Sequence, residues 1–88
     1  LIYLNEVGGQ DELIFDGASF ALNADLSVAA QLPAFEENIT TLTWRKTADG
    51  WRCSGPSTAQ LEGDKADYAA CVLGLRDYVR KNGFPGVL

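Results

Sequence analysis

The sequence predicts an α+β fold in which β-hairpins occupy most of the chain and a single helix follows them. Three observations predict it. Short apolar runs alternate with Gly, Asn and Asp turn residues over roughly the first 53 positions. A run of small and polar residues containing Gly55-Pro56 then interrupts the pattern. From residue 64 onward, apolar side chains recur with a helical period.

The first strands are predicted from their turn residues. Residues 2–7 form a short strand that Gly8-Gly9 closes, and residues 13–15 resume as a strand before the Asp16-Gly17 turn. The polar turn at residues 23–25 then predicts a hairpin. The strands of this hairpin are residues 19–22 and 27–32, and Pro33 ends the second one.

A further strand is predicted over residues 39–45, which are rich in threonine. Asp49-Gly50 lies between Trp44 and Trp51 and indicates a second, looser hairpin in which the two indoles pack. Residues 54–63 have the composition of a linker.

The helix is predicted over residues 65–82. Asp64 serves as its N-cap, Gly83 occupies the position after its last turn, and Pro85 prevents it from continuing. Gly74 inside the helix costs about 1 kcal/mol relative to alanine and therefore marks a close approach by a neighbouring element. The expected packing face consists of the apolar residues Tyr68, Cys71, Val72, Leu75 and Val79.

Composition limits the function classes. With 88 residues, 47% hydrophobic and 22% charged, the chain has the make-up of one small globular unit. It contains no histidine, which excludes a Ser-His-Asp triad, a Cys-His pair and a His-ligated zinc site within these residues. No apolar run approaches the roughly 18 residues of a membrane span.

Charge argues against two kinds of partner. The formal net charge is −5, and residues 1–38 carry acids but no lysine or arginine. Such a block repels phosphate backbones and anionic lipid, so we expect neither nucleic acid nor a membrane as a partner. The alternative interpretations are a solvated acidic surface and a surface whose counter-charges lie on other polypeptide.

The two cysteines are too few for a disulfide framework and lack metal-binding spacing, which predicts reduced thiols in a cytoplasmic protein. Cys71 lies on the expected apolar helix face and is predicted to be a buried structural thiol. Cys53 lies beside Arg52, which favours a lower thiol pKa, but no general base accompanies it.

The densest polar cluster lies at residues 8–19. Its carboxylates Asp11, Glu12 and Asp16 have the chemistry of a divalent-metal site or an acid/base pair. On a strand, Glu12 and Asp16 share one face while Asp11 points to the other, so the local geometry does not make a compact metal cage. We therefore assign no metal ligands.

Two blocks of the sequence resemble one enzyme family. The first reads Asn5-x-Val7-Gly8-Gly9-Gln10-Asp11-Glu12-Leu13-x-Phe15-Asp16-Gly17-x-Ser19, and the second reads Leu73-Gly74-Leu75-Arg76-Asp77-Tyr78-Val79-Arg80-Lys81-Asn82-Gly83-Phe84-Pro85-Gly86-Val87. The first resembles the late part of the nitrilase-like glutaminase domain of bacterial glutamine-dependent NAD+ synthetases. The second resembles the start of the synthetase domain of the same family.

The resemblance implies a division of the chain. Residues 1–45 would be the C-terminal strands of a nitrilase-like α/β sandwich, residues 46–63 a linker, and residues 64–88 the first helix and strand start of an adenine-nucleotide-hydrolase-like α/β synthetase domain. The expected fold is thus an α+β fragment of a larger cytoplasmic enzyme. With half of a sandwich missing, the isolated chain is expected to expose sheet edges and to form a homo-oligomer.

The resemblance also implies an activity for the parent protein. In this family a cysteine nucleophile with a glutamate and a lysine hydrolyses glutamine, and the ammonia amidates deamido-NAD after ATP and Mg2+ activate its carboxylate as an adenylate. The catalytic triad and the Ser-Gly-Gly-x-Asp-Ser phosphate loop have no counterparts in this chain. We therefore expect no catalytic residue and no bound cofactor here, and an inactive isolated chain.

The residues carried over from the resemblance are candidate substrate-binding residues. Gln10, Asp11, Glu12 and Asp16 match the glutaminase block and are expected at or behind the glutamine pocket; the alternative is a structural turn network. Tyr78 matches the helix that precedes the phosphate loop and is expected to approach the dinucleotide, or to pack the helix. Leu26 departs from the family pattern because nitrilase-type hairpins usually carry glycine there.

Two other functions remain open. One is a small non-catalytic module whose acidic block binds a basic partner and whose helix dimerises. The other is a related nitrilase-type amidase, which the block ending in Gly83-Phe84-Pro85-Gly86 disfavours, because an amidase has no need of a synthetase segment.

Overall fold

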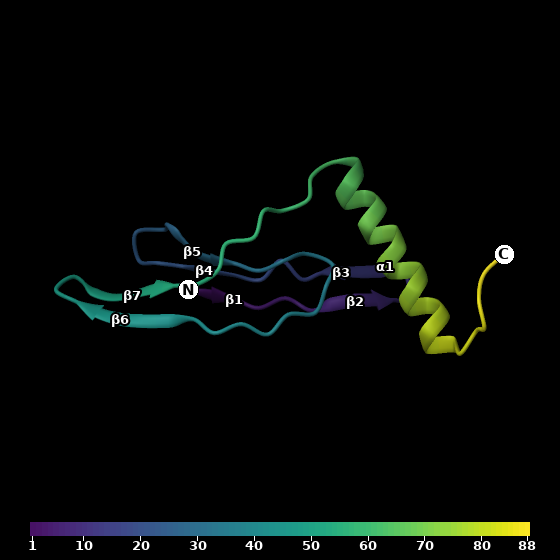
Figure 1. The fold of residues 1–88 in the computed structure, drawn as a ribbon, viewed down its shortest axis with the longest axis horizontal. Helices are drawn as coiled ribbons and strands as arrows, with labels where there is room; N and C mark the ends of the chain where they lie inside the picture. Colours follow the sequence, from purple (N-terminus) through teal and green to yellow (C-terminus); the bar gives the residue numbers. More distant parts are fainter.

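A computed structural model describes all of residues 1–88 and shows an elongated chain of 59 × 25 × 18 Å, with the strands at one end and the helix across the other (Figure 1). The elements are β1 (Ile2–Tyr3), β2 (Val7–Gln10), β3 (Leu13–Asp16), β4 (Phe20–Leu22), β5 (Val28–Gln31), β6 (Thr43–Thr47), β7 (Gly50–Ser54) and α1 (Asp64–Asn82). An α+β arrangement of small sheets and one helix is confirmed.

The largest sheet has three strands in the order β1-β4-β5, all antiparallel. The predicted hairpin of β4 and β5 is confirmed. In its turn, the N–H of Asn23 donates to Ser27 O at 3.0 Å and the N–H of Leu26 donates to Asn23 O at 3.0 Å. Leu26 has φ 65°, a left-handed conformation that favours glycine, which explains physically why leucine is unusual at this position.

The hairpin β2–β3 corrects one prediction. Gly8-Gly9 was expected to close the first strand, but both glycines lie inside β2, opposite Phe15 and Ile14. The turn is instead Asp11-Glu12, with Asp11 at φ 52°. The glycines are needed within the strand because α1 approaches its backbone there, as described below.

The hairpin β6–β7 begins later than predicted, at Thr43 instead of residue 39. Trp44 and Trp51 lie on one face of it but are 41% and 61% exposed, and the aromatic pairs of the structure lie elsewhere, at Tyr3–Phe20 and Tyr78–Phe84. The expected packing of the two indoles against each other is therefore wrong.

Residues assigned to a linker are largely structured. Residues 46–54 belong to the β6–β7 hairpin, and residues 55–58 continue alongside β5. The N–H of Gly55 donates to Ala29 O at 3.0 Å, and the N–H of Gln31 donates to Pro56 O at 2.9 Å. These bonds attach residues 46–58 to the strands, while the division into domains stays a prediction.

The predicted C-terminal end of α1 is confirmed, but the predicted N-cap is wrong. Gly83 has φ 68°, and its N–H donates to Arg80 O while that of Phe84 donates to Val79 O, which is the Schellman arrangement. At the other end the helix begins at Asp64, and the capping position is Gly63, with no side-chain cap. The predicted Asp64 N-cap is wrong because that residue is already inside the first turn.

The helix packs by a different face from the one predicted. Tyr68 is 73% exposed and Leu75 52% exposed, whereas Leu73 is 2% exposed. The packing face consists of small or polar residues around that leucine, namely Ala66, Ala69, Ala70, Gly74 and Asp77. Small side chains allow α1 to approach the β2 backbone closely. Of the predicted face, Val79 is half-buried and the other four residues are exposed.

The predicted burial of Cys71 is wrong. Both cysteines are free thiols, as predicted, but Cys71 is exposed and Cys53 is buried. Cys53 forms the core of the strand region with Ala21 and Ala30. The reason is that Cys71 lies on the uncovered face of α1, whereas β7 folds against β5.

Little of the chain is buried. Eight of 88 residues are buried, and Leu73 is the largest fully buried side chain. The accessible surface is 6850 Å², against about 5,000 Å² for a compact protein of this mass. The radius of gyration is 16.4 Å, against about 12 Å for a compact chain of this length.

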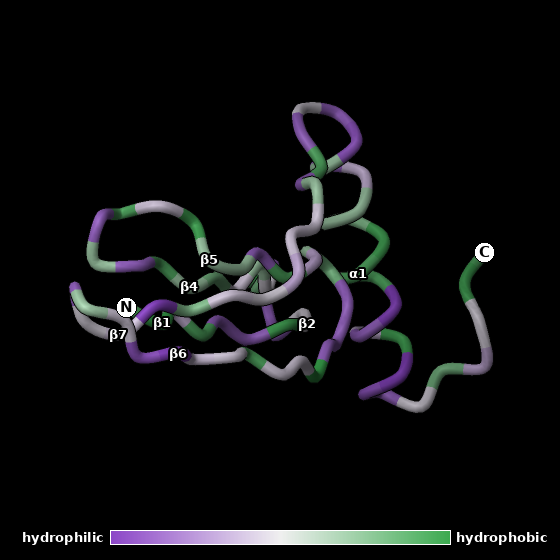
Figure 2. The backbone as a smooth tube through the Cα atoms, turned by 60° about the vertical axis from the view of Figure 1, so that its left-hand side comes forward, coloured by the Kyte–Doolittle hydropathy of each residue, from purple (hydrophilic) through white to green (hydrophobic).

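Open apolar surface is thus a main feature of the structure, and Figure 2 shows hydrophobic stretches both in the N-terminal strands and along α1. A largely apolar cavity lies between β1, β4 and residues 38–42. The single helix, α1, lacks the length of apolar sequence that a membrane crossing requires.

Candidate functional site

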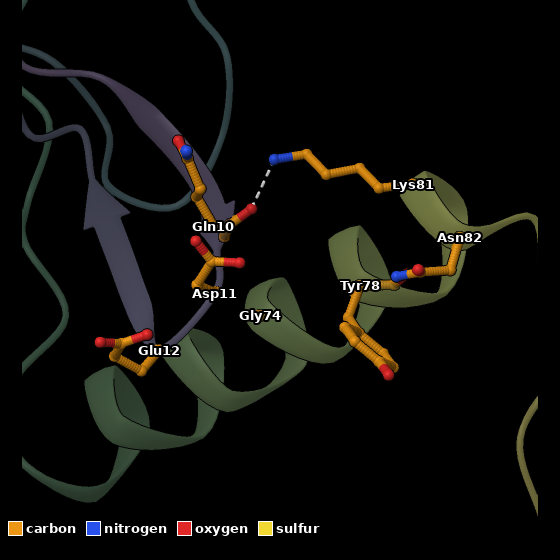
Figure 3. A pocket seen from close by; sticks show the side chains of 8 residues that line it. Gln10, Asp11, Glu12, Gly74, Tyr78, Lys81 and Asn82 are labelled. Atoms are coloured by element: carbon orange, nitrogen blue, oxygen red, sulfur yellow. Dashed lines mark hydrogen bonds between the residues drawn. The ribbon is translucent and has the colours of Figure 1, made fainter.

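A polar cavity of about 390 Å³ lies where the turn of β2–β3 meets α1 (Figure 3). Its lining residues come from the two sequence blocks, which are far apart along the chain: Gly9, Gln10, Asp11, Glu12, Gly74, Tyr78, Lys81 and Asn82. The hairpin turn forms one wall and the second half of α1 the other.

Two glycines allow the walls to meet. A Cβ atom on Gly9 would lie 3.0 Å from the Cα of Gly74, and a Cβ on Gly74 would lie 3.0 Å from Cδ1 of Ile14. Real side chains rarely make contacts this short, so strand and helix pack here almost backbone to backbone. The prediction that Gly74 marks a close approach is confirmed.

Two side chains of α1 bind the backbone of Gly9. The N–H of Gly9 donates to Oδ2 of Asp77 at 2.9 Å, and Nζ of Lys81 donates to the Gly9 oxygen at 2.6 Å, the bond dashed in Figure 3. Asp77 and Lys81 are four residues apart, so they project from the same side of the helix. We call this pair the Gly9 clamp.

The clamp has an electrostatic consequence. The hydrogen bond from the Gly9 N–H, helped by Arg76 and Lys81, holds the pKa of Asp77 below its usual value, although desolvation acts in the opposite direction. The Nε atom of Arg76 lies 3.4 Å from Oδ1 of the Asp77 carboxylate. The site therefore favours an ionised Asp77.

We expect acid to open the clamp. A folded-state pKa below the unfolded value stabilises the contact above pH about 4, and this contribution is lost as the pH falls through the folded-state pKa. The protection factor of the Gly9 amide, which compares its exchange rate with the intrinsic rate at the same pH, should fall in that range. Asp77→Asn should remove this pH dependence and Asp67→Asn should not; a Gly9 protection factor that is equally pH-dependent in the wild type and in Asp77→Asn would contradict the expectation.

The structure brings four of the five candidate residues to this cavity. Gln10, Asp11 and Glu12 line the hairpin side and Tyr78 the helix side. In Figure 3, Glu12 points outward at the tip of the hairpin and the Tyr78 ring extends away from Gln10. Whether these side chains bind substrate stays a prediction.

Asp16 lies apart from the others. It ends β3 opposite Val7, and its Oδ1 accepts a hydrogen bond from Nδ2 of Asn5 at 2.7 Å. Its backbone oxygen accepts the N–H of Phe35 at 2.7 Å. These contacts join the base of the hairpin to neighbouring segments.

Sequence reasoning missed three residues here: Asp77, Lys81 and Asn82. All three lie in the second block, but no role was predicted for them. The available signal was the spacing of Ala66, Ala70 and Gly74, four residues apart on one helix face, which indicates a small-residue contact surface. Asp77 continues that face.

The lining is suited to binding and contains no cysteine, serine or threonine. Asp11 and Glu12 carry negative charge and Lys81 positive charge, while Gln10 and Asn82 have amides that both donate and accept hydrogen bonds. No group of three acidic, cysteine or histidine side chains comes together to hold a metal ion. The arrangement is that of a polar binding surface between two elements.

Comparisons with known proteins relate this geometry to a family. No family model matches the chain. Over 89 residues the chain is 53% identical to the glutamine-dependent NAD(+) synthetase of Rhodobacter capsulatus, an alignment that covers 100% of the chain. The chain is homologous to part of the glutamine-dependent NAD(+) synthetases. The synthetase of Acinetobacter baylyi is 42% identical over 88 residues, again covering 100% of the chain.

A solved synthetase matches the fold as well. The glutamine-dependent NAD+ synthetase of Acinetobacter baumannii, in complex with ADP, matches 98% of this chain with a TM-score of 0.87 and 40% sequence identity. The match includes 16% of that synthetase chain. The chain likewise spans 16% of the length of the Rhodobacter and Acinetobacter baylyi synthetases. The NAD synthetase resemblance seen in the two blocks is thereby confirmed.

Proposed function

We propose that this chain is the segment of a glutamine-dependent NAD+ synthetase that joins its glutaminase and synthetase units. The observation that supports this most strongly is the 53% identity to such a synthetase over the whole chain. In the proposed reaction, glutamine is hydrolysed to glutamate and ammonia, and ammonia amidates the ATP-activated carboxylate of deamido-NAD. This chain contributes structure and binding surface to the reaction, and no catalytic group.

Within that function, the hairpin residues would act on the glutamine side. The carboxylates of Asp11 and Glu12 suit the ammonium group of glutamine, and Gln10 suits a polar group of the same ligand. Asp16 would hold loops behind the pocket through its contacts with Asn5 and Phe35. Tyr78, on the α1 side, would approach the dinucleotide.

ATP and Mg2+ do not fit the residues of this chain alone. Its acidic side chains form no three-ligand group, and a single glycine, Gly63, precedes α1 in place of a glycine-rich phosphate loop. We propose that other parts of the protein hold both.

The finer architecture is also part of the proposal. Residues 1–45 would complete a nitrilase-like sandwich and residues 64–88 would open an adenine-nucleotide-hydrolase-like domain, with residues 46–63 between them. The open apolar surface supports burial against further polypeptide of the same cytoplasmic, homo-oligomeric enzyme.

The test is an activity assay of the protein translated from the complete reading frame that contains this sequence. With deamido-NAD, ATP, Mg2+ and glutamine it should form NAD, glutamate and AMP, whereas the isolated 88 residues should release no ammonia from glutamine. Absence of NAD formation with either glutamine or ammonium chloride would refute the family function. Glutamine hydrolysis by the isolated chain would refute its proposed lack of catalytic groups.

A further inference from the structure

The Gly9 clamp engages a part of β2 that the sheet itself leaves free. The two-residue turn Asp11-Glu12 makes Gln10 and Leu13 the hydrogen-bonded pair that closes the hairpin. The next pair, Gly9 and Ile14, is then of the non-hydrogen-bonded kind, so the N–H and C=O of Gly9 point away from β3. Asp77 and Lys81 satisfy both groups.

The contact is specific in geometry as well as in bonding. It joins residues 68 and 72 positions apart in the sequence, through a partly buried region in which Gly9 itself is buried. The side chain of Asp77 is only 17% exposed. Movement of α1 along or away from β2 would break both bonds together.

The clamp also determines the shape of the polar cavity. Gly9 is followed by Gln10, the last residue of β2, and then by the turn residues Asp11 and Glu12. Lys81 itself lines the cavity. Because the clamp fixes the start of the turn against α1, the separation of the two cavity walls depends on it. Asp77 does not need to touch a ligand for this effect.

From these contacts we propose that Asp77 and Lys81 are positioning residues that couple α1 to the hairpin turn. The proposal rests on the proposed function, in which the turn belongs to the glutaminase side and α1 to the synthetase side. The clamp would then be required when glutamine supplies the ammonia, and dispensable when free ammonia is provided.

The decisive experiment compares the two nitrogen donors in the complete protein. Asp77→Ala and Lys81→Met should each lower NAD formation from glutamine by up to about 100-fold, the scale of a misplaced site, and should leave the rate with ammonium chloride within about two-fold of the wild type. Lys81→Arg retains a donor and should recover much of the glutamine-dependent rate.

Matched controls lie on the exposed surface of the same helix. Asp67→Ala and Lys65→Met remove the same kinds of charge away from the clamp and should leave the ratio of the two rates unchanged. Hydrogen exchange of the Gly9 amide gives a second readout, which should quicken in Asp77→Ala but not in Asp67→Ala.

Each remaining outcome is informative. A ratio of glutamine to ammonia rates that is unchanged in both clamp variants would overturn the proposal. If both rates have fallen equally, the clamp has a purely structural role. A wild-type protein that forms no NAD from either donor would instead refute the proposed function, and the Gly9 exchange would still show whether the clamp holds the turn.

Discussion

Gly9→Ala should detach α1 from the hairpin. The new Cβ would lie 3.0 Å from the Cα of Gly74 and 3.4 Å from its backbone oxygen, and neither atom can rotate away as a side-chain end would. The helix must therefore shift as a body, which also lengthens the bonds to Asp77 and Lys81. Overpacking of this kind costs about 1–3 kcal/mol.

The effect is measured as the free energy of local opening, from hydrogen exchange at the amides of α1, with Leu73 as the reporter. Gly86→Ala is the matched control, because a Cβ there meets nothing within 4 Å. Gly74→Ala should be milder than Gly9→Ala, since its nearest atom is the flexible Cδ1 end of Ile14 and alanine favours the helix. Equal protection of Leu73 in wild type and Gly9→Ala would show that the backbone contact is not tight.

Asn23→Ala should destabilise the junction of the β4–β5 turn with β7. The Oδ1 of Asn23 accepts the Cys53 N–H at 2.8 Å, and its Nδ2 lies 3.4 Å from the Cys53 oxygen and 3.3 Å from Oγ of Ser27. Both Asn23 and Cys53 are buried, so water does not replace the lost partner freely. An unsatisfied buried group costs about 1–3 kcal/mol, and truncation leaves at least the Cys53 N–H in that state.

Denaturant unfolding and exchange at the Cys53 amide measure this loss. Asn23→Asp keeps an acceptor for the Cys53 N–H and should be less damaging than Asn23→Ala. Asn38→Ala removes the same side chain from an exposed position and serves as the control. If Asn23→Ala unfolds no more readily than Asn38→Ala, the side chain of Asn23 does not hold β7 in place.

Local features of the fold were predictable where neighbouring residues decide them. The β4–β5 hairpin follows from the turn Asn23-Ala24-Asp25, and the end of α1 follows from Gly83, because a left-handed residue is needed there. The close approach at Gly74 was predictable from its cost inside a helix. The element that makes the approach, β2, was not.

The candidate site was predictable in part. Gln10, Asp11, Glu12 and Tyr78 were chosen from two separate blocks, and the structure places all four around one cavity. Asp16 was chosen with them because it is near in sequence, but an extended strand carries it to the other end of the hairpin.

The sequence by itself determined the kinds of element, the position of the helix end and the relationship to NAD synthetases, because turn chemistry, helix capping and sequence identity are properties of short or aligned stretches. Only the tertiary structure decided which face of α1 packs, which cysteine is buried and what Asp77 and Lys81 bind. Apolar periodicity indicated the wrong face because most of the large apolar residues of this helix remain uncovered, while glycine and alanine provide the close contact. A hydrogen bond from the Gly9 N–H to the Asp77 carboxylate joins residues 68 positions apart and cannot be predicted from the sequence around either residue.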